Sequence, residues 1–201
     1  VRYKFLFKIV AFSLLLFSGL TSSATHLLGG YMNYEFLNID PTSGNYRYKI
    51  TFHVYRDCSG KVELDDQITL GVYLNDNNKS LNQQPTFKLV AKQRVQPPGS
   101  IECDFYRKNV CIEYGLYEGI ISLKPYSEGY HITYTRCCRN VQNNIVQDGA
   151  MPSQGQTYYC YIPSTALQNS SPAFYGVPSP YMCVNDTNSF LFDAVDRDGD
   201  S

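Results

Sequence analysis

The sequence predicts an all-β protein, an antiparallel β-sandwich of the immunoglobulin-like kind. Three observations support this fold class. Between residues 46 and 54 the even positions are apolar and the odd positions are mostly polar, which is the period of a strand with one buried face. Further segments of the same character are separated by turn-forming clusters such as Asn75-Asp76-Asn77-Asn78. No segment of helical length shows a clean repeat of 3.6 residues.

The strands follow one another along most of the chain. Alternating or β-favouring residues occupy the ranges 31–37, 46–54, 67–74, 86–95, 110–114, 116–123, 130–136, 157–162 and 189–195. Two stretches rich in turn-forming residues, 149–155 and 169–174, interrupt this succession of strands. We therefore expect a disulfide-bearing sandwich over residues 25–165. Residues 166–201 are expected to open a second β-sandwich that continues beyond this sequence.

Residues 1–24 have the pattern of a secretory signal peptide. Three basic residues precede an apolar run over residues 9–20, which is too short to span a bilayer comfortably. Ser22 and Ala24 supply the small residues of a signal-peptidase site, so we expect cleavage before Thr25. The mature protein is then secreted or held on the outer cell surface, and it contains no transmembrane segment.

The composition argues against some classes of binding partner. The net charge of −1 offers no electrostatic attraction for nucleic acid or for an anionic membrane surface. The apolar character is carried by 18 tyrosines and 11 phenylalanines, without any tryptophan. Such rings suit half-buried sheet surfaces and exposed binding surfaces.

The cysteines of the sequence are expected to stabilise the fold through disulfides. The export signal places them in an oxidising compartment, where disulfides persist. Zinc is a poor explanation, because there is no C-x-x-C pair and the three histidines are scattered. We therefore expect disulfides among the seven cysteines, which are Cys58, Cys103, Cys111, Cys137, Cys138, Cys160 and Cys183.

The spacing of the cysteines suggests pairings. Cys103 and Cys111 flank a polar stretch of hairpin length, so we expect them to form one bridge. Cys137 and Cys138 are adjacent near the end of a strand and point to opposite sides, so they need different partners. Cys58 is the expected partner of one of them. Cys160 and Cys183 are the remaining candidates for bridges. An odd count leaves one of the seven thiols free or bonded outside this sequence.

Four blocks of the mature sequence carry a resemblance to a known family: His26-Leu27-Leu28-Gly29-Gly30-Tyr31, Tyr55-Arg56-Asp57-Cys58-Ser59-Gly60, Cys137-Cys138-Arg139-Asn140 and Asp196-Arg197-Asp198-Gly199-Asp200-Ser201. They resemble the N-terminal region of large surface proteins of Bacteroidetes. The resemblance implies that cadherin-like or PKD-like repeats follow. It also implies export by the type IX secretion machinery, through a gliding-motility-associated C-terminal domain that lies outside this sequence. It supplies no catalytic residues.

We therefore expect a non-catalytic structural or adhesion protein whose partner is an extracellular protein or glycan surface. A serine hydrolase would need a G-x-S-x-G elbow, which the sequence lacks. The alternative is a carbohydrate-binding module, because β-sandwiches often bind sugars through exposed aromatic rings. Tyr158, Tyr159 and Tyr161 illustrate this reading, since neighbours on a strand face opposite ways and at least one ring should be exposed.

A second alternative is a copper histidine-brace enzyme. If cleavage released His26 as the first residue, its amine and imidazole would hold copper together with His53 or His131. However, Thr25 is a poor residue at the cleavage position. His53 and His131 fall on the polar positions of their strands, so we expect solvated side chains that contribute little to folding.

The end of the sequence predicts a calcium site. Asp196, Asp198 and Asp200 alternate with other residues, Gly199 permits a tight bend, and Asp193 can add an oxygen from the preceding strand. The pattern is similar to the loops of cadherin-like repeats, where calcium stiffens the junction between domains. The alternative is a solvated acidic turn.

Overall fold

The structure of the chain is a computed structural model, and it describes residues 27–60, 62–96, 110–137, 155–174, 181, 187 and 193–199. These residues form antiparallel strands almost throughout, and the helical element among them is one 3₁₀ turn, η1 (Thr165–Leu167). The predicted all-β sandwich is confirmed. No helix in the described ranges is long and apolar enough to cross a membrane.

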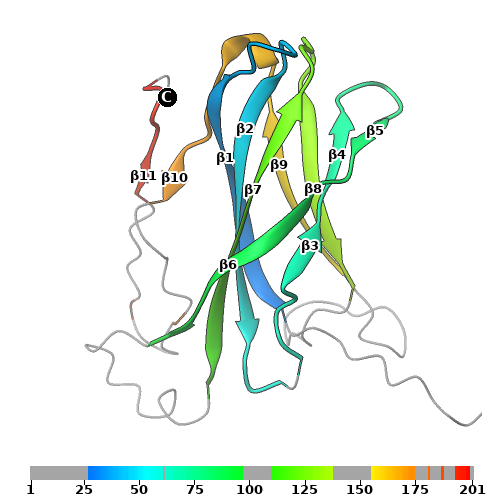
Figure 1. The fold of residues 1–201 in the computed structure, drawn as a ribbon. Helices are drawn as coiled ribbons and strands as arrows, with labels where there is room; N and C mark the ends of the chain where they lie inside the picture. Colours follow the sequence, from blue (N-terminus) through cyan, green and yellow to red (C-terminus); the bar gives the residue numbers. More distant parts are fainter. Residues whose placement is uncertain are drawn as a thin grey trace, which may run out of the picture.

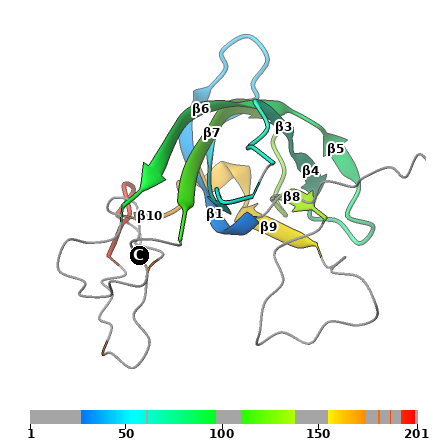
Figure 2. The same ribbon diagram turned by 90° about the horizontal axis from the view of Figure 1, so that it is seen from below.

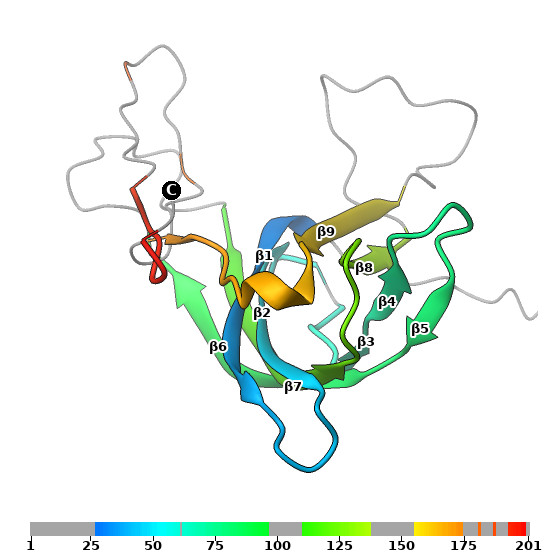
Figure 3. The same cartoon turned by 90° about the horizontal axis from the view of Figure 1, so that it is seen from above.

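Two packed sheets form the body of the molecule. The five-stranded sheet has the order β1 (Leu27–Ile39), β2 (Tyr46–Asp57), β7 (Ile112–Leu123), β6 (Thr86–Val95) and β3 (Gln67–Thr69). The four-stranded sheet has the order β5 (Leu81–Gln83), β4 (Gly71–Leu74), β8 (Tyr130–Arg136) and β9 (Gln156–Ile162). Figures 2 and 3 look along the strands and show both sheets curving around a shared interior. A small pair, β10 (Ala173–Phe174) and β11 (Ala194–Val195), lies beside β1 (Figure 1).

The core lies between the inner faces of the two sheets. On β2 the predicted alternation is confirmed, because the even positions from Tyr48 to Val54 are fully buried. β8 and β9 supply the opposite wall, so that Phe52 and Tyr158 meet with ring centroids 4.8 Å apart. Burial of such aromatic side chains dominates the stability of a sandwich.

Residues 67–74, predicted as one strand, are divided between the two sheets. β3 pairs with β6, whereas β4 pairs with β5 and β8. The chain changes sheet at Leu70, whose side chain is fully buried and whose N–H donates a hydrogen bond of 3.0 Å to Pro85 O. Between β5 and β6 the chain crosses back from the four-stranded sheet to the five-stranded sheet. This hairpin therefore belongs to both sheets and closes one side of the sandwich.

β7 is a single strand, although a break at Gly115 was expected from the sequence. Gly115 and Gly119 face the core, where each makes room for a neighbouring side chain. A Cβ atom on Gly115 would lie 2.4 Å from Leu64 Cδ1, and one on Gly119 would lie 2.4 Å from Phe87 Cδ1. The two glycines therefore serve packing and do not end the strand.

The chain after η1 returns to β1. Ser171 N donates to Tyr34 O at 2.8 Å, and Tyr34 N donates to Ser171 Oγ at 2.9 Å. Phe36 N donates to Ser170 Oγ at 3.1 Å. Two serine hydroxyls thus accept hydrogen bonds from β1 in place of a neighbouring strand.

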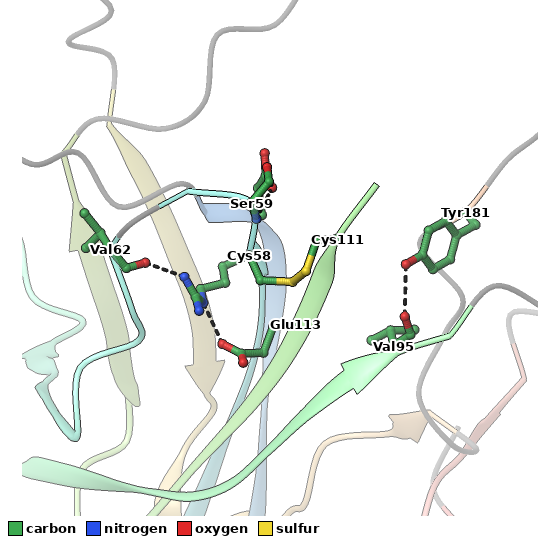
Figure 4. Close-up of a disulfide and its surroundings, with 9 residues drawn as sticks. Cys58, Ser59, Val62, Val95, Cys111, Glu113 and Tyr181 are labelled. Carbon is green, nitrogen blue, oxygen red and sulfur yellow. Dashed lines mark hydrogen bonds and ion pairs between the residues drawn. A yellow bond between two sulfur atoms is a disulfide. The ribbon is translucent and has the colours of Figure 1, made fainter. Parts of the chain in front are cut away.

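Further described residues of this segment contact the outer face of the five-stranded sheet. The Phe174 ring meets Tyr31 edge-on with centroids 5.1 Å apart. Tyr181 Oη donates to Val95 O at 2.9 Å (Figure 4). The division of the chain into domains at residue 165 stays a prediction, and several of the described residues beyond it contact the first sandwich.

Candidate binding surface

The outer face of the four-stranded sheet carries a group of aromatic side chains. Tyr73, His131 and Tyr161 stand opposite one another on β4, β8 and β9, and Tyr159 lies one row along β9. Each alternates with a buried residue of its strand and therefore points outward. Tyr159 is 53% exposed and Tyr161 is 37% exposed, whereas Tyr158 is buried, as the alternation predicted. We call Tyr73, His131, Tyr159 and Tyr161 the aromatic face.

The rings of the aromatic face lie close enough to act together. His131 lies between two tyrosines, 5.6 Å from the centroid of Tyr159 and 5.2 Å from that of Tyr161. The corresponding interplanar angles are 32° and 35°. Hydroxyl groups continue the surface on the next rows, where Thr135 Oγ1 and Thr157 Oγ1 are 3.1 Å apart. The surface therefore combines ring faces with hydroxyl groups.

Hydrogen bonds fix the histidine at the centre of this face. His131 Nδ1 lies 2.6 Å from Tyr159 Oη. His131 Nε2 lies 2.8 Å from both Asn75 Oδ1 and Lys79 Nζ. Lys79 Nζ also donates to Asn75 Oδ1 at 2.5 Å. An amide and an ammonium group therefore border the aromatic rings.

The turn between β4 and β5 positions these two polar groups. Asp76 Oδ1 accepts hydrogen bonds from the N–H groups of Asn78, at 3.1 Å, and Ser80, at 2.9 Å. Asn75 is held from its other side, because its N–H donates to Gly129 O at 3.0 Å. Lys79 has a φ of 49°, a left-handed conformation that is uncommon for a residue with a side chain.

The electrostatics of the aromatic face keep His131 neutral. Burial, and then the positive charge of Lys79, lower the pKa of His131 below its ordinary value. At neutral pH one imidazole nitrogen therefore accepts a hydrogen bond and the other donates one. Among the described residues Lys79 forms no ion pair with a carboxylate.

A cleft lies on the opposite side of the molecule from the aromatic face. It is a cleft of about 220 Å³ between the outer face of the five-stranded sheet and residues 170–174. Its walls carry paired charges. Lys49 Nζ lies 2.7 Å from Glu118 Oε1, and Arg197 forms an ion pair with Glu35.

His53 lies in this cleft and is more enclosed than its position on the strand predicted. Its ring stacks on Tyr31, Nδ1 lies 2.7 Å from Tyr114 Oη, and Nε2 lies 3.0 Å from Asn33 Oδ1. Burial lowers the pKa of His53 to about 4, against a smaller opposing effect of Glu118. The expectation of a solvated His53 is therefore wrong, because the chain after η1 covers the face to which it points.

The histidines proposed as copper ligands are not gathered in the described part of the chain. His53 points outward from the five-stranded sheet and His131 points outward from the four-stranded sheet, on opposite sides of the core. His26 lies outside the described residues. Both nitrogens of His53 and both of His131 have hydrogen-bonding neighbours within the protein.

The disulfide pattern differs from the expected one. Cys58 and Cys111 form a disulfide with a Cα–Cα distance of 5.0 Å, so the predicted Cys103–Cys111 bridge is wrong (Figure 4). Cys58 is likewise not the partner of Cys137 or Cys138. The structural reason is that Asp57 pairs with Ile112, which leaves the next residues of the antiparallel strands β2 and β7 opposite each other.

The other described cysteines have separate roles. Cys137 is disulfide-bonded. Its partner lies outside the described residues, which exclude Cys103, Cys138 and Cys183. Cys160, expected among the bridged candidates, is a free thiol in the core, and burial raises its pKa to about 12. A thiol with so high a pKa is a poor nucleophile.

The Tyr55–Gly60 block is structural. Next to the disulfide, Arg56 is buried, and its Nε donates to Glu113 Oε2 at 2.6 Å. Arg56 Nη1 donates to Val62 O at 2.5 Å (Figure 4). Arg56 thus links β2 to β7 and to the loop that follows β2. Its buried positive charge is balanced by the carboxylate of Glu113.

The acidic motif near the end of the sequence does not form a metal centre from the described residues alone. Asp196 Oδ1 accepts the N–H of Asp198 at 3.0 Å, and an oxygen of Asp198 accepts the N–H of Ser170. Residues 193–199 contribute to no group of three or more side chains that could hold a metal ion within the described ranges. Asp200 lies outside these ranges, so calcium binding stays a prediction.

Parts of the candidate surface escaped the sequence analysis. Tyr159 and Tyr161 were recognised as ambiguous aromatic residues. Tyr73 was assigned only to a strand and Asn75 only to a turn, and Lys79 was assigned to neither. The signal that would have found them is the turn itself. It directly follows the strand that carries Tyr73, and its polar residues stand at the edge of an aromatic surface.

Comparison with protein-family models, with curated proteins and with solved structures finds no match to this chain.

Proposed function

We propose that this chain is a non-catalytic adhesion domain of an exported surface protein and that it binds glycans through the aromatic face. The observation that supports this most directly is the exposure of Tyr159 and Tyr161 on either side of His131. Large exposed rings on a soluble domain are characteristic of interaction surfaces.

The chemistry of the aromatic face favours sugars. Tyrosine rings offer apolar faces on which the C–H groups of a pyranose ring pack, and their hydroxyls offer hydrogen bonds at the edge. Thr133 places a hydroxyl on the adjacent row, which can accept or donate a hydrogen bond to a sugar hydroxyl. The surface is open, as binding along an extended chain requires.

A glycan array tests the proposal. The mature chain from Thr25 should bind a subset of glycans, and Tyr159→Ala and Tyr161→Ala should each weaken that binding roughly tenfold, since each removes one stacking surface. Phe174→Ala is the matched control, because it removes a ring that is 39% exposed on the other side of the molecule. Absence of glycan binding, or binding unchanged in both tyrosine variants, would refute the proposal.

The cellular setting belongs to the same proposal. The leader pattern and the resemblance to Bacteroidetes surface proteins support secretion to the outer surface, with the type IX machinery acting on a C-terminal domain outside this sequence. The disulfide between Cys58 and Cys111 is compatible with an oxidising compartment. N-terminal sequencing of the exported protein should begin at Thr25. A start at His26 would instead favour the copper alternative.

Calcium binding at the acidic motif is proposed for the protein extended beyond Ser201. Asp193, Asp196, Asp198 and Asp200 would supply carboxylate oxygens together with ligands from the following domain. The extended protein should melt at a higher temperature with millimolar calcium than with chelator, and Asp198→Ala should remove the difference. Equal melting temperatures would identify the motif as an acidic turn.

A further inference from the structure

The positive charge at the edge of the aromatic face is not balanced by a neighbouring carboxylate. Lys79 Nζ contacts two neutral groups, Asn75 Oδ1 at 2.5 Å and His131 Nε2 at 2.8 Å. Within the described residues its ammonium group forms no ion pair. By contrast, Lys49, Arg56, Lys92 and Arg136 each pair with an acidic side chain.

The acidic side chains of the neighbouring turns are engaged elsewhere. The Asp76 carboxylate accepts hydrogen bonds from the side chain and then the backbone N–H of Ser80, and both lower its pKa. An oxygen of Glu128 accepts the hydroxyl of Ser127 at 3.2 Å. The side chains on the face itself are tyrosines, threonines and a histidine that is neutral at pH 7. Neither of these carboxylates forms an ion pair with the Lys79 ammonium group.

Lys79 is held in place by the turn. Its left-handed backbone conformation is one that side-chain-bearing residues adopt at a cost, and such conformations often persist where function requires them. The hydrogen bonds from Lys79 Nζ to Asn75 and His131 hold the ammonium group beside the rings. The cation is thus preorganised before a ligand arrives, which reduces the entropy lost on binding.

We propose that the aromatic face binds an anionic glycan, one whose sugars carry carboxylate or sulfate groups. This proposal rests on the proposed function and specifies its ligand class. The apolar side of a sugar ring stacks on Tyr159 or Tyr161, and its hydroxyls bond to the threonines. The carboxylate or sulfate group pairs with Lys79. The anion takes the place of the ion-pair partner that Lys79 lacks among the described residues.

Titration calorimetry with matched probes tests the ligand class. The probes are an oligogalacturonate, its carboxyl-reduced counterpart and a sulfated oligosaccharide of similar length. The mature chain should bind at least one anionic probe more tightly than the carboxyl-reduced one. Lys79→Gln should weaken binding of that anionic probe about 3- to 5-fold, as expected for one exposed ion pair. It should leave binding of the carboxyl-reduced probe unchanged.

Lys88→Gln is the matched control, because it removes the same charge from an exposed position on β6 in the other sheet. Lys79→Arg should retain binding of the anionic probe. If the carboxyl-reduced probe binds as tightly as the anionic ones, or if Lys79→Gln has no effect, the anionic class is wrong while glycan binding survives. If Tyr159→Ala changes the binding of no probe, the proposed function fails as well.

Discussion

His53 and Tyr31 lie parallel on the outer face of the five-stranded sheet, with ring centroids 4.2 Å apart and an interplanar angle of 10°. They are direct neighbours across the β1–β2 ladder. The stack encloses an imidazole whose two nitrogens already have partners, Tyr114 and Asn33. Protonation would bring a charge into this partly desolvated position, which explains why burial lowers the pKa of His53 to about 4.

The stability of the protein should therefore fall in mildly acidic solution. The folded state holds His53 with a pKa of about 4, below the ordinary value of 6.5, so the unfolded state binds a proton more readily. The contribution of His53 is fully present above pH 6.5 and is lost as the pH falls towards 4. It amounts to at most about 3 kcal/mol. Urea unfolding at pH 7.5, 6 and 5 should show the decline.

Histidine variants distinguish the effect of protonating His53 on stability from the effect of protonating carboxylates. His53→Gln should flatten the decline between pH 6.5 and 5, whereas His131→Gln should leave most of it in place, because His131 is less enclosed. His53→Ala should also lower the free energy of unfolding by about 1–3 kcal/mol at pH 7.5, because it leaves Tyr114 and Asn33 without a partner. A pH profile identical in wild type and His53→Gln would contradict this account.

Loss of the Cys58–Cys111 disulfide should destabilise the sandwich. The bridge closes a loop with a sequence separation of 53 residues, and removing such a constraint typically costs about 2–5 kcal/mol. Cys111→Ser should lower the midpoint of denaturant unfolding accordingly. Cys160→Ala, which changes a thiol that is not bridged, is the control and should have a smaller effect.

Peptide mapping provides an independent check of the same bridge. Under non-reducing conditions, proteolysis should yield a fragment that links residues 58 and 111 and separates on reduction. A fragment that links residues 103 and 111 would restore the original sequence-based pairing and overturn the structural one.

Substitution of Gly119 should disturb the core. A Cβ atom there would lie 2.4 Å from Phe87 Cδ1, and the displaced ring is itself fully buried. Gly119→Ala should lower the free energy of unfolding by about 1–3 kcal/mol through overpacking. Gly29→Ala is the matched control, because a Cβ at Gly29 would meet nothing within 4 Å. Equal melting temperatures for the two variants would show that Phe87 adjusts freely.

Removal of the Lys79 charge should raise the pKa of His131. Burial is the larger cause of the lowered value, and the Lys79 ammonium is the second. Lys79→Gln should therefore shift the His131 titration to higher pH in an NMR experiment on the imidazole resonances. Lys88→Gln should leave the titration unchanged. A His131 pKa that does not respond to Lys79→Gln would show that the ammonium group is not held beside the ring.

The strands and their inward faces were predictable because they depend on local alternation. Tyr46–Asp57 and Tyr130–Arg136 match their predicted ranges closely, and their buried residues fall on the expected positions. Alternation does not report a bend, however, and so it joined β3 and β4 across Leu70. It also does not report which distant strands pair. The Cys58–Cys111 bridge depends on the pairing of β2 with β7, and this pairing was not visible in the sequence.

The candidate surfaces, too, could be predicted only in part from the sequence. The outward positions of His53, His131, Tyr159 and Tyr161 follow from parity, which the sequence carries. Whether an outward side chain meets water depends on what lies over it. Residues 170–174 cover the His53 side, whereas Tyr159 and Tyr161 are left exposed. The position of Lys79 depends on a turn geometry that local composition specifies only as a turn.

The serine contacts with β1 also affect how copies of the protein meet at high concentration. An outermost strand normally presents unused N–H and C=O groups, on which a strand of another molecule can pair and start aggregation. At Tyr34 both groups are occupied by Ser171, and at Phe36 the N–H group is occupied by Ser170. These contacts therefore oppose strand addition along this stretch of β1, so copies of the protein at high concentration can touch there without merging into one continuous sheet.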